Sequence, residues 1–102
     1  METTLSPPVR SLARVATDKA ERYLGQMCKH FAHKLPVIQK GANGTLPFSI
    51  GTCRMEADGG GLTLRLEAPD ADQMAQLQEV VASHLLRFAF REDMTVEWTT
   101  PA

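Results

Sequence analysis

The stretch Asp58-Gly59-Gly60-Gly61-Leu62-Thr63-Leu64-Arg65-Leu66-Glu67-Ala68 decides how the rest of this 102-residue chain folds. Consecutive glycines after an aspartate are typical of a tight hairpin loop. The residues that follow alternate, with leucines on one face and polar side chains on the other. Such alternation predicts a strand that packs one face on a core and turns its other face to solvent.

Further strands are expected on both sides of this hairpin, because the same alternation recurs there. They are Val9–Ala16, Thr45–Ala57 and Met94–Thr99, with a possible short extra strand at 36–40 before the turn at Gly41–Gly44. Within Thr45–Ala57 the apolar residues change phase at Gly51. This change predicts a β-bulge with glycine at the irregular position.

Two amphipathic helices separate the predicted strands. The first is expected to be capped by Thr17 and to end before Pro36, and the second to run from Pro69-Asp70 to Arg91–Asp93. The apolar stripe of the first helix is Ala20, Tyr23, Leu24, Met27, Phe31 and Leu35. The stripe of the second helix is Met74, Leu77, Val81, His84, Leu85 and Phe88.

Without the short strand the order is βαββαβ, the ferredoxin-like order. The fold class expected is therefore α+β: a two-layer sandwich of a mostly antiparallel sheet with both helices on one face. Residues 1–8 are expected to form a disordered tail, 9–99 a single domain and 100–102 a second tail.

Composition excludes several classes of partner. The net charge of −1 argues against strong electrostatic capture of nucleic acid, and Thr63, Arg65 and Glu67 stand where an RNA-binding sheet would carry aromatic residues. No apolar run approaches the length of about 18 residues that a membrane span needs. Without a signal peptide in Met1–Pro8, we expect a cytoplasmic protein whose Cys28 and Cys53 are free thiols.

His84 is the first candidate for a ligand-binding residue, because it lies within the apolar stripe of the second helix. Arg87 and Arg91 follow at helical spacing and could clamp a carboxylate or phosphate. His30, on the first helix, is a fourth candidate. The alternative is structural: a neutral core histidine bonded to a carbonyl, and arginines that complement the C-terminal end of the helix dipole.

A metal site is only weakly indicated. Cys28 lies on the opposite side of the first helix from His30 and His33, so it cannot join them on one ion. His30 and His33 could share a metal, but a structural zinc site needs four ligands. No metal and no cofactor are therefore expected.

No catalytic motif stands out. The serines lie in no nucleophile-elbow sequence, and the chain has neither a phosphate loop nor a CxxC pair. The outward face of the sheet mixes arginine, glutamate and threonine, which suits either a ligand or partner face or a solvated face with weak ion pairs. Whether the protein is an enzyme stays uncertain, and the pattern leans against it.

Several segments together resemble the bacterial family called domain of unknown function 2218, over about residues 10 to 98. They are Ala13–Thr17, Arg22–Leu24, Lys29–Lys34, Leu66–Ala68, His84–Glu92 and Val96–Trp98. The recurrent motif residues of the family match here as His30, His33, His84, Arg87, Phe88, Arg91, Glu92 and Trp98. The resemblance implies association with a flavin-dependent siderophore-interacting reductase, to which such a domain is joined in some bacteria, and hence a role near iron–siderophore handling.

Three functions remain open from the sequence. The first is a non-enzymatic binding or accessory module for a small anion or iron chelate, gripped by His84, Arg87, Arg91 and His30. The second is a small metal- or histidine-dependent enzyme that uses His84 and His30. The third is a protein-interaction domain that forms a homodimer through its sheet.

Overall fold

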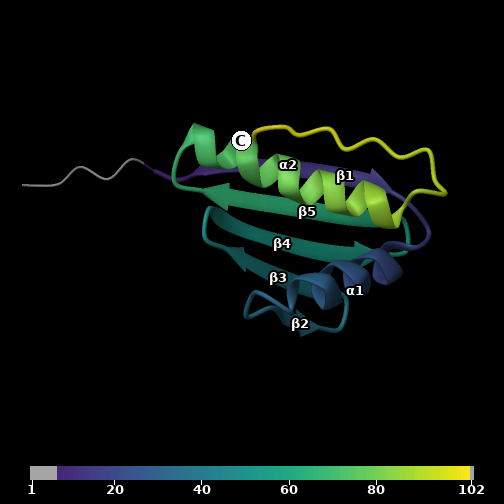
Figure 1. The fold of residues 1–102 in the computed structure, drawn as a ribbon. Coiled ribbons are helices and arrows are strands. Elements are labelled where there is room, and N and C mark those ends of the chain that lie inside the picture. The colour runs from purple at the N-terminus through teal and green to yellow at the C-terminus, as the bar shows by residue number, and fades with distance from the viewer. Residues whose placement is uncertain (1–6, 102) are drawn as a thin grey trace, which may run out of the picture.

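The computed structural model describes residues 7–101, which form five strands and two helices (Figure 1). The predicted N-terminal tail therefore lies, apart from Pro7 and Pro8, outside the described residues, as does Ala102. The elements are β1 (Val9–Ala16), α1 (Ala20–Phe31), β2 (Ile38–Lys40), β3 (Asn43–Phe48), β4 (Gly51–Asp58), β5 (Gly61–Ala68) and α2 (Ala71–Phe88).

All five strands join one antiparallel sheet in the order β1-β5-β4-β3-β2. The hairpin predicted at Asp58–Gly61 connects β4 to β5, and Asp58 pairs with Gly61 across it. Both helices lie over the same face of the sheet, α1 over β3 and β4 and α2 over β5 and β1 (Figure 1). The α+β class, the antiparallel sheet and the placement of the helices are confirmed.

The strand order is not the simple ferredoxin-like order that the sequence predicted. Phe48 pairs with Gly51, so Ser49 and Ile50 form a tight turn and the expected single strand Thr45–Ala57 is a hairpin of β3 and β4. The phase change at Gly51 marks this turn and not a β-bulge. The short extra strand is present as β2, which pairs with β3 at the edge of the sheet.

The prediction of a last strand at Met94–Thr99 is also wrong. The segment runs as an extended strap past α2 and β1, in yellow in Figure 1, and it pairs with the sheet at one residue only. Thr99 and Leu12 exchange two backbone hydrogen bonds of 2.8 Å. Met94, Val96 and Trp98 are half-buried against the core, so side-chain packing holds the strap and the backbone ladder stops at a single bridge.

Both helices are shorter than predicted. The second helix begins where the sequence predicted, and the amide of Gln73 donates to Asp70 at 2.8 Å, so Asp70 is the N-cap of α2. Thr17 does not cap α1: it lies before the helix, which begins after Lys19, and its hydroxyl is engaged with Glu92. α2 ends at Phe88, three residues before the predicted Arg91, because the chain turns there toward the strap.

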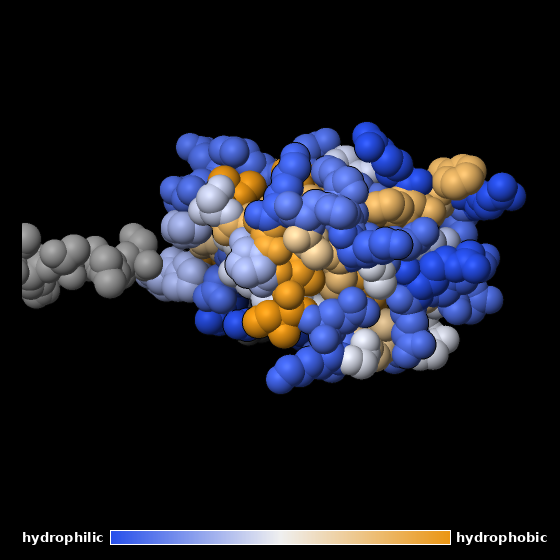
Figure 2. Space-filling model, turned by 60° about the horizontal axis from the view of Figure 1, so that its bottom comes forward, coloured by the Kyte–Doolittle hydropathy of each residue, from blue (hydrophilic) through white to orange (hydrophobic). Residues whose placement is uncertain are grey.

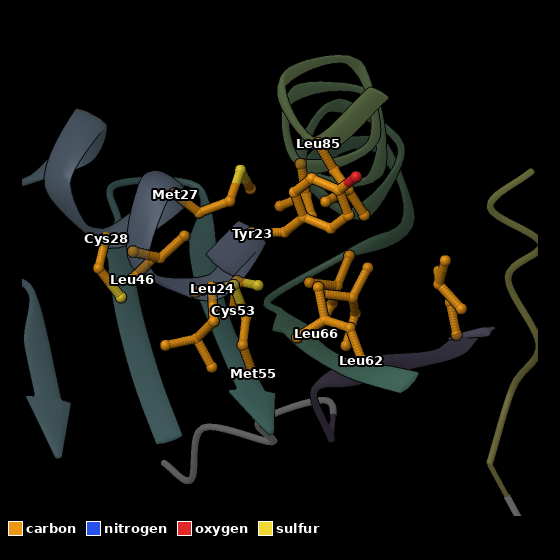
Figure 3. Packing of buried hydrophobic residues seen from close by; sticks show 14 of the residues in the cluster. Tyr23, Leu24, Met27, Cys28, Leu46, Cys53, Met55, Leu62, Leu66 and Leu85 are labelled. Atoms are coloured by element: carbon orange, nitrogen blue, oxygen red, sulfur yellow. The ribbon is translucent and has the colours of Figure 1, made fainter. Parts of the chain in front are cut away.

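The core lies between the sheet and the two helices (Figure 3). Both predicted stripes are buried there, except that Leu35, His84 and Phe88 are only half-buried at the edge. Cys28 and Cys53 are buried free thiols, as expected. Burial, and to a lesser extent the neighbouring Cys28, raises the pKa of Cys53 to about 12, so this thiol is protonated and behaves as a small apolar group.

The surface seen in Figure 2 is mostly hydrophilic, with apolar side chains gathered in a band across it. The large apolar side chains exposed among the described residues are Ile38 on β2, Leu86 on α2 and Phe90 beyond α2. No helix within residues 7–101 has the length and apolar character to cross a membrane. The cytoplasmic location stays a prediction.

Candidate functional site

The C-terminal end of α1 packs against the C-terminal half of α2, and this contact brings two of the predicted site residues together. The rings of His30 and His84 have their centroids 5.0 Å apart. Phe31 lies 4.8 Å from each of them, and Phe88 lies 5.8 Å from His30. The two histidines, fifty-four positions apart in sequence, thus share one aromatic cluster at the edge of the helix layer.

His84 is held by its own helix. Its Nδ1 lies 2.7 Å from the carbonyl oxygen of Val80, one turn earlier. Because a carbonyl oxygen can only accept, Nδ1 carries the proton and the lone pair of the neutral ring is on Nε2. A bond from the ring to a backbone carbonyl is what the structural interpretation of His84 predicted. It leaves Nε2, the second ring nitrogen, free to bind a ligand.

His30 is mostly exposed at the end of α1, but its ring lies against Phe31 and Phe88. Burial of the ring lowers the pKa of His30, and the charges of His84, Arg87, Lys34 and His33 lower it further. A histidine with a lowered pKa is neutral at pH 7. His30 therefore presents an imidazole lone pair and not a positive charge to a ligand.

The two arginines predicted to grip an anion lie at the surface near the end of α2. Arg87 is exposed on the last turn of α2. Arg91 lies beyond the end of the helix, with its guanidinium carbon 5.2 Å from the ring centroid of Phe90, itself 73% exposed. Such a cation–π contact occupies the guanidinium face at the surface.

His33 lies beyond the end of α1 and is exposed. Within residues 7–101 no three side chains of the histidine, cysteine, aspartate and glutamate types are grouped so as to hold a metal ion. The pair His30 and His33, weakly predicted as metal ligands, therefore has no third protein ligand among the described residues.

A hydrogen-bonded network at the start of α1 was not foreseen. The phenol of Tyr23 and the hydroxyl of Thr17 both donate to the carboxylate of Glu92, Thr17 at 3.0 and 3.1 Å. The hydrogen bond from Tyr23 is the main cause that lowers the pKa of Glu92. The signal was present in the sequence, since a tyrosine in an apolar stripe needs a partner for its hydroxyl when it is buried.

The outer face of the sheet, away from the helices, carries two adjacent rows of side chains across β1, β5 and β4. The register places Arg10, Glu67 and Thr52 in one row. The next row consists of Leu12, Arg65 and Arg54. Arg54 and Arg65 are therefore direct cross-strand partners, and like charges in this position destabilise a sheet.

These two rows form the floor of a hollow of about 280 Å³, which Pro101, two residues after the strap, borders on one side. Three arginines and one glutamate line it: Arg10, Arg54, Arg65 and Glu67. The hollow is thus more positive than the chain as a whole, whose net charge is −1.

Ion pairs compensate the arginines of this face unequally. Arg10 lies 3.7 Å from Glu67, and Arg65 lies 3.6 Å from Glu56, both weak and exposed pairs. Within residues 7–101 no carboxylate pairs with Arg54. Arg54 is therefore the least compensated charge in the hollow.

Arg14, farther along β1, differs from these arginines. It bonds both carboxylate oxygens of Asp58, at 2.7 and 2.8 Å, and this contact holds the pKa of Asp58 below its usual range. Arg14 is structural, whereas Arg54 and Arg65 face a hollow.

Comparison with known proteins places the chain in a family. The family described as "Uncharacterized protein conserved in bacteria (DUF2218)" matches residues 12–99. The NMR structure of PA4090 from Pseudomonas aeruginosa is similar, with a TM-score of 0.76 and 35% sequence identity over 89% of this chain and 95% of that chain. No curated protein matches the chain. The resemblance seen in the sequence is confirmed: this chain belongs to the bacterial family of domain of unknown function 2218.

Proposed function

We propose that this domain is a non-enzymatic binding module for a small anionic ligand, and that the ligand binds in the hollow on the outer face of the sheet. The observation that carries the proposal is the direct pairing of Arg54 with Arg65 on the floor of that hollow. An anion between two like charges removes their repulsion and gains charge-assisted hydrogen bonds from both guanidinium groups.

The chemistry of the lining favours a carboxylate or a phosphate. The planar guanidinium group matches the two oxygens of such an anion, and Arg54 has its donors free of any ion pair within residues 7–101. Leu12 and Pro101 supply an apolar border for the carbon skeleton of an organic anion. A few polar groups within a partly apolar hollow are typical of small-molecule sites.

The association implied by the family resemblance would make the ligand an anionic iron chelate. This expectation rests on the resemblance, and the arginine-lined hollow is compatible with it by charge. The predicted grip by His84, Arg87, Arg91 and His30 is the competing location, because it also presents positive charge beside aromatic rings.

The test titrates inorganic phosphate, citrate and ferric citrate into the protein by calorimetry, alongside Arg54→Gln, Arg65→Gln and Arg87→Gln. Arg22→Gln, on the exposed face of α1, is the matched control. We expect one saturable site, weakened about tenfold or more by Arg54→Gln and Arg65→Gln, since a hydrogen bond to a charged group contributes about 1.5–3 kcal/mol. Equal losses in the Arg22→Gln control, or losses in Arg87→Gln alone, would reject the hollow as the site.

A homodimer formed through the outer face of the sheet would cover the same hollow. Sedimentation velocity, run at several protein concentrations with and without citrate, separates the two occupants. Binding in the hollow predicts a monomer whose mass does not change with citrate. A dimer that citrate dissociates would assign the face to self-association.

A further inference from the structure

We propose that His30 and His84 form a two-histidine site for a divalent transition-metal ion such as Cu²⁺ or Zn²⁺. The site joins the end of α1 to α2, on the opposite side of the sheet from the arginine-lined hollow. It is independent of the anion-binding function proposed above, and it uses two residues that the sequence marked as candidates for a ligand site.

The spacing of the two rings fits one shared metal ion. Imidazole nitrogens bind Zn²⁺ at about 2.0–2.1 Å, and each ring centroid lies about 1.2 Å behind its nitrogen. Two imidazoles that meet at a metal with an angle of about 90–110° therefore have centroids about 4.5–5.3 Å apart. The observed separation of His30 and His84 is 5.0 Å, with an angle of 47° between their planes.

The environment of His84 prepares it for this role. A histidine that binds a metal through one nitrogen commonly donates the proton of its other nitrogen to a carbonyl oxygen. Nδ1 of His84 makes this bond to Val80. Within residues 7–101 no protein group forms a hydrogen bond with Nε2, so the lone pair of this nitrogen is free to bind a metal ion. The imidazole of His30, 5.0 Å away between ring centroids, supplies the second nitrogen ligand.

The groups around the pair decide what else binds the ion. Phe31 and Phe88 cover the rings and offer no ligand. Lys34, His33 and Arg87 are the other charged or titratable groups near His30. Their positive charge weakens the affinity for a bare cation, and it favours an anion such as chloride or phosphate in the remaining coordination positions.

Two protein ligands make a site that is weaker than a four-ligand structural zinc site and is open to exogenous ligands. Cu²⁺ is the most sensitive probe, because nitrogen sites bind it more tightly than the other divalent first-row metals. Cys28 takes no part: its sulfur faces Gly44 of β3 and is buried on the other flank of α1.

The test is a titration of untagged protein with Cu²⁺ and, separately, Zn²⁺, followed by calorimetry and by electron paramagnetic resonance of the copper form. The variants are His30→Asn and His84→Asn. His33→Asn is the matched control, because His33 is the one histidine of the chain outside the proposed pair and lies three positions from His30. Arg54→Gln is added so that this site and the anion site can fail separately.

We expect one Cu²⁺ per chain, hyperfine coupling to two imidazole nitrogens, and a rise in melting temperature with Zn²⁺. Loss of either histidine should weaken metal binding by about tenfold or more. Removing even a group that only hydrogen-bonds a metal ligand lowers metal affinity by about tenfold. His33→Asn and Arg54→Gln should change it less than about twofold. If His84→Asn does not fold, His30→Asn decides alone, because His30 is exposed. Unchanged binding in His30→Asn, an equal loss in His33→Asn, or coupling to fewer than two imidazoles overturns the proposal.

Discussion

The phenol of Tyr23 donates a hydrogen bond to the carboxylate of Glu92, and this contact fastens the chain between α2 and the strap to the first helix. Tyr23 is only 4% exposed and sits between α1 and α2, beside Leu85 (Figure 3). Thr17, the residue after β1, donates to the same carboxylate. The start of the chain's first helix and the segment just before it thus meet Glu92, about seventy positions later in the sequence.

Replacing Tyr23 with phenylalanine tests what this contact contributes. We expect Tyr23→Phe to lower the free energy of unfolding by about 1 kcal/mol, because it removes a hydrogen bond to a charged acceptor while the ring still fills its place in the core. The carboxylate keeps Thr17 and partial access to water, which limits the loss. Urea denaturation measures it, and an unchanged midpoint would show that Glu92 contributes nothing to stability through Tyr23.

The alkaline limit of the fold should follow the same phenol. Burial, and then the hydrogen bond to Glu92, raises the pKa of Tyr23 from 10.0 to about 12. Because the pKa is raised in the folded state, the stabilisation is complete below pH 10 and is lost as the pH rises toward 12. Tyr23 is the only tyrosine, so phenolate absorbance reports it directly. Ionisation near pH 10 in protein that is still folded would contradict this assignment.

Two glycines should respond in opposite directions to alanine. At Gly51 a Cβ atom would lie 2.5 Å from the backbone oxygen of Glu67 and 2.8 Å from a methyl group of Leu77. Since backbone cannot yield as a side chain can, we expect Gly51→Ala to destabilise the fold by about 1–3 kcal/mol. At Gly25, inside α1, a Cβ meets nothing within 4 Å, and alanine should stabilise by about 0.5–1 kcal/mol. Thermal unfolding of both variants checks the pair, and a shift of the same sign in both would refute it.

The repulsion between Arg54 and Arg65 has a signature in stability that does not depend on any ligand. In buffer without multivalent anions, Arg54→Gln should raise the free energy of unfolding by about 0.2–1 kcal/mol, because it removes a like-charge pair directly across two strands. Arg14→Gln is the contrasting control and should lower stability, since Arg14 bonds Asp58 and Thr63. If Arg54→Gln lowers stability as Arg14→Gln does, Arg54 has a structural partner and the hollow loses its main support.

The candidate sites show the limit of what sequence alone predicts. Spacing marked His30, His84, Arg87 and Arg91 as joint candidates, but it gave no distance between the two helices. The docking of α1 on α2 places His84 beside His30, and Arg91, beyond the end of α2 at Phe88, lies over the ring of Phe90. Which residues of two helices meet depends on where the helices cross, and no pattern within either helix contains that information.

The sequence by itself determined the features that depend on local periodicity. Alternation in Leu62–Ala68 specified β5, helical spacing specified the buried faces of α1 and α2, and Asp70 specified the start of α2. Only the tertiary structure decided the rest. A bulge and a tight turn both break a period of two, so Gly51 was ambiguous until Phe48 was seen to pair with it. The pairing of Arg54 with Arg65 depends on strand register. Whether Met94–Thr99 forms a strand depends on whether its backbone finds a partner at residues other than Thr99. These are contacts between distant segments, and their free energies are set by the packing of the whole chain.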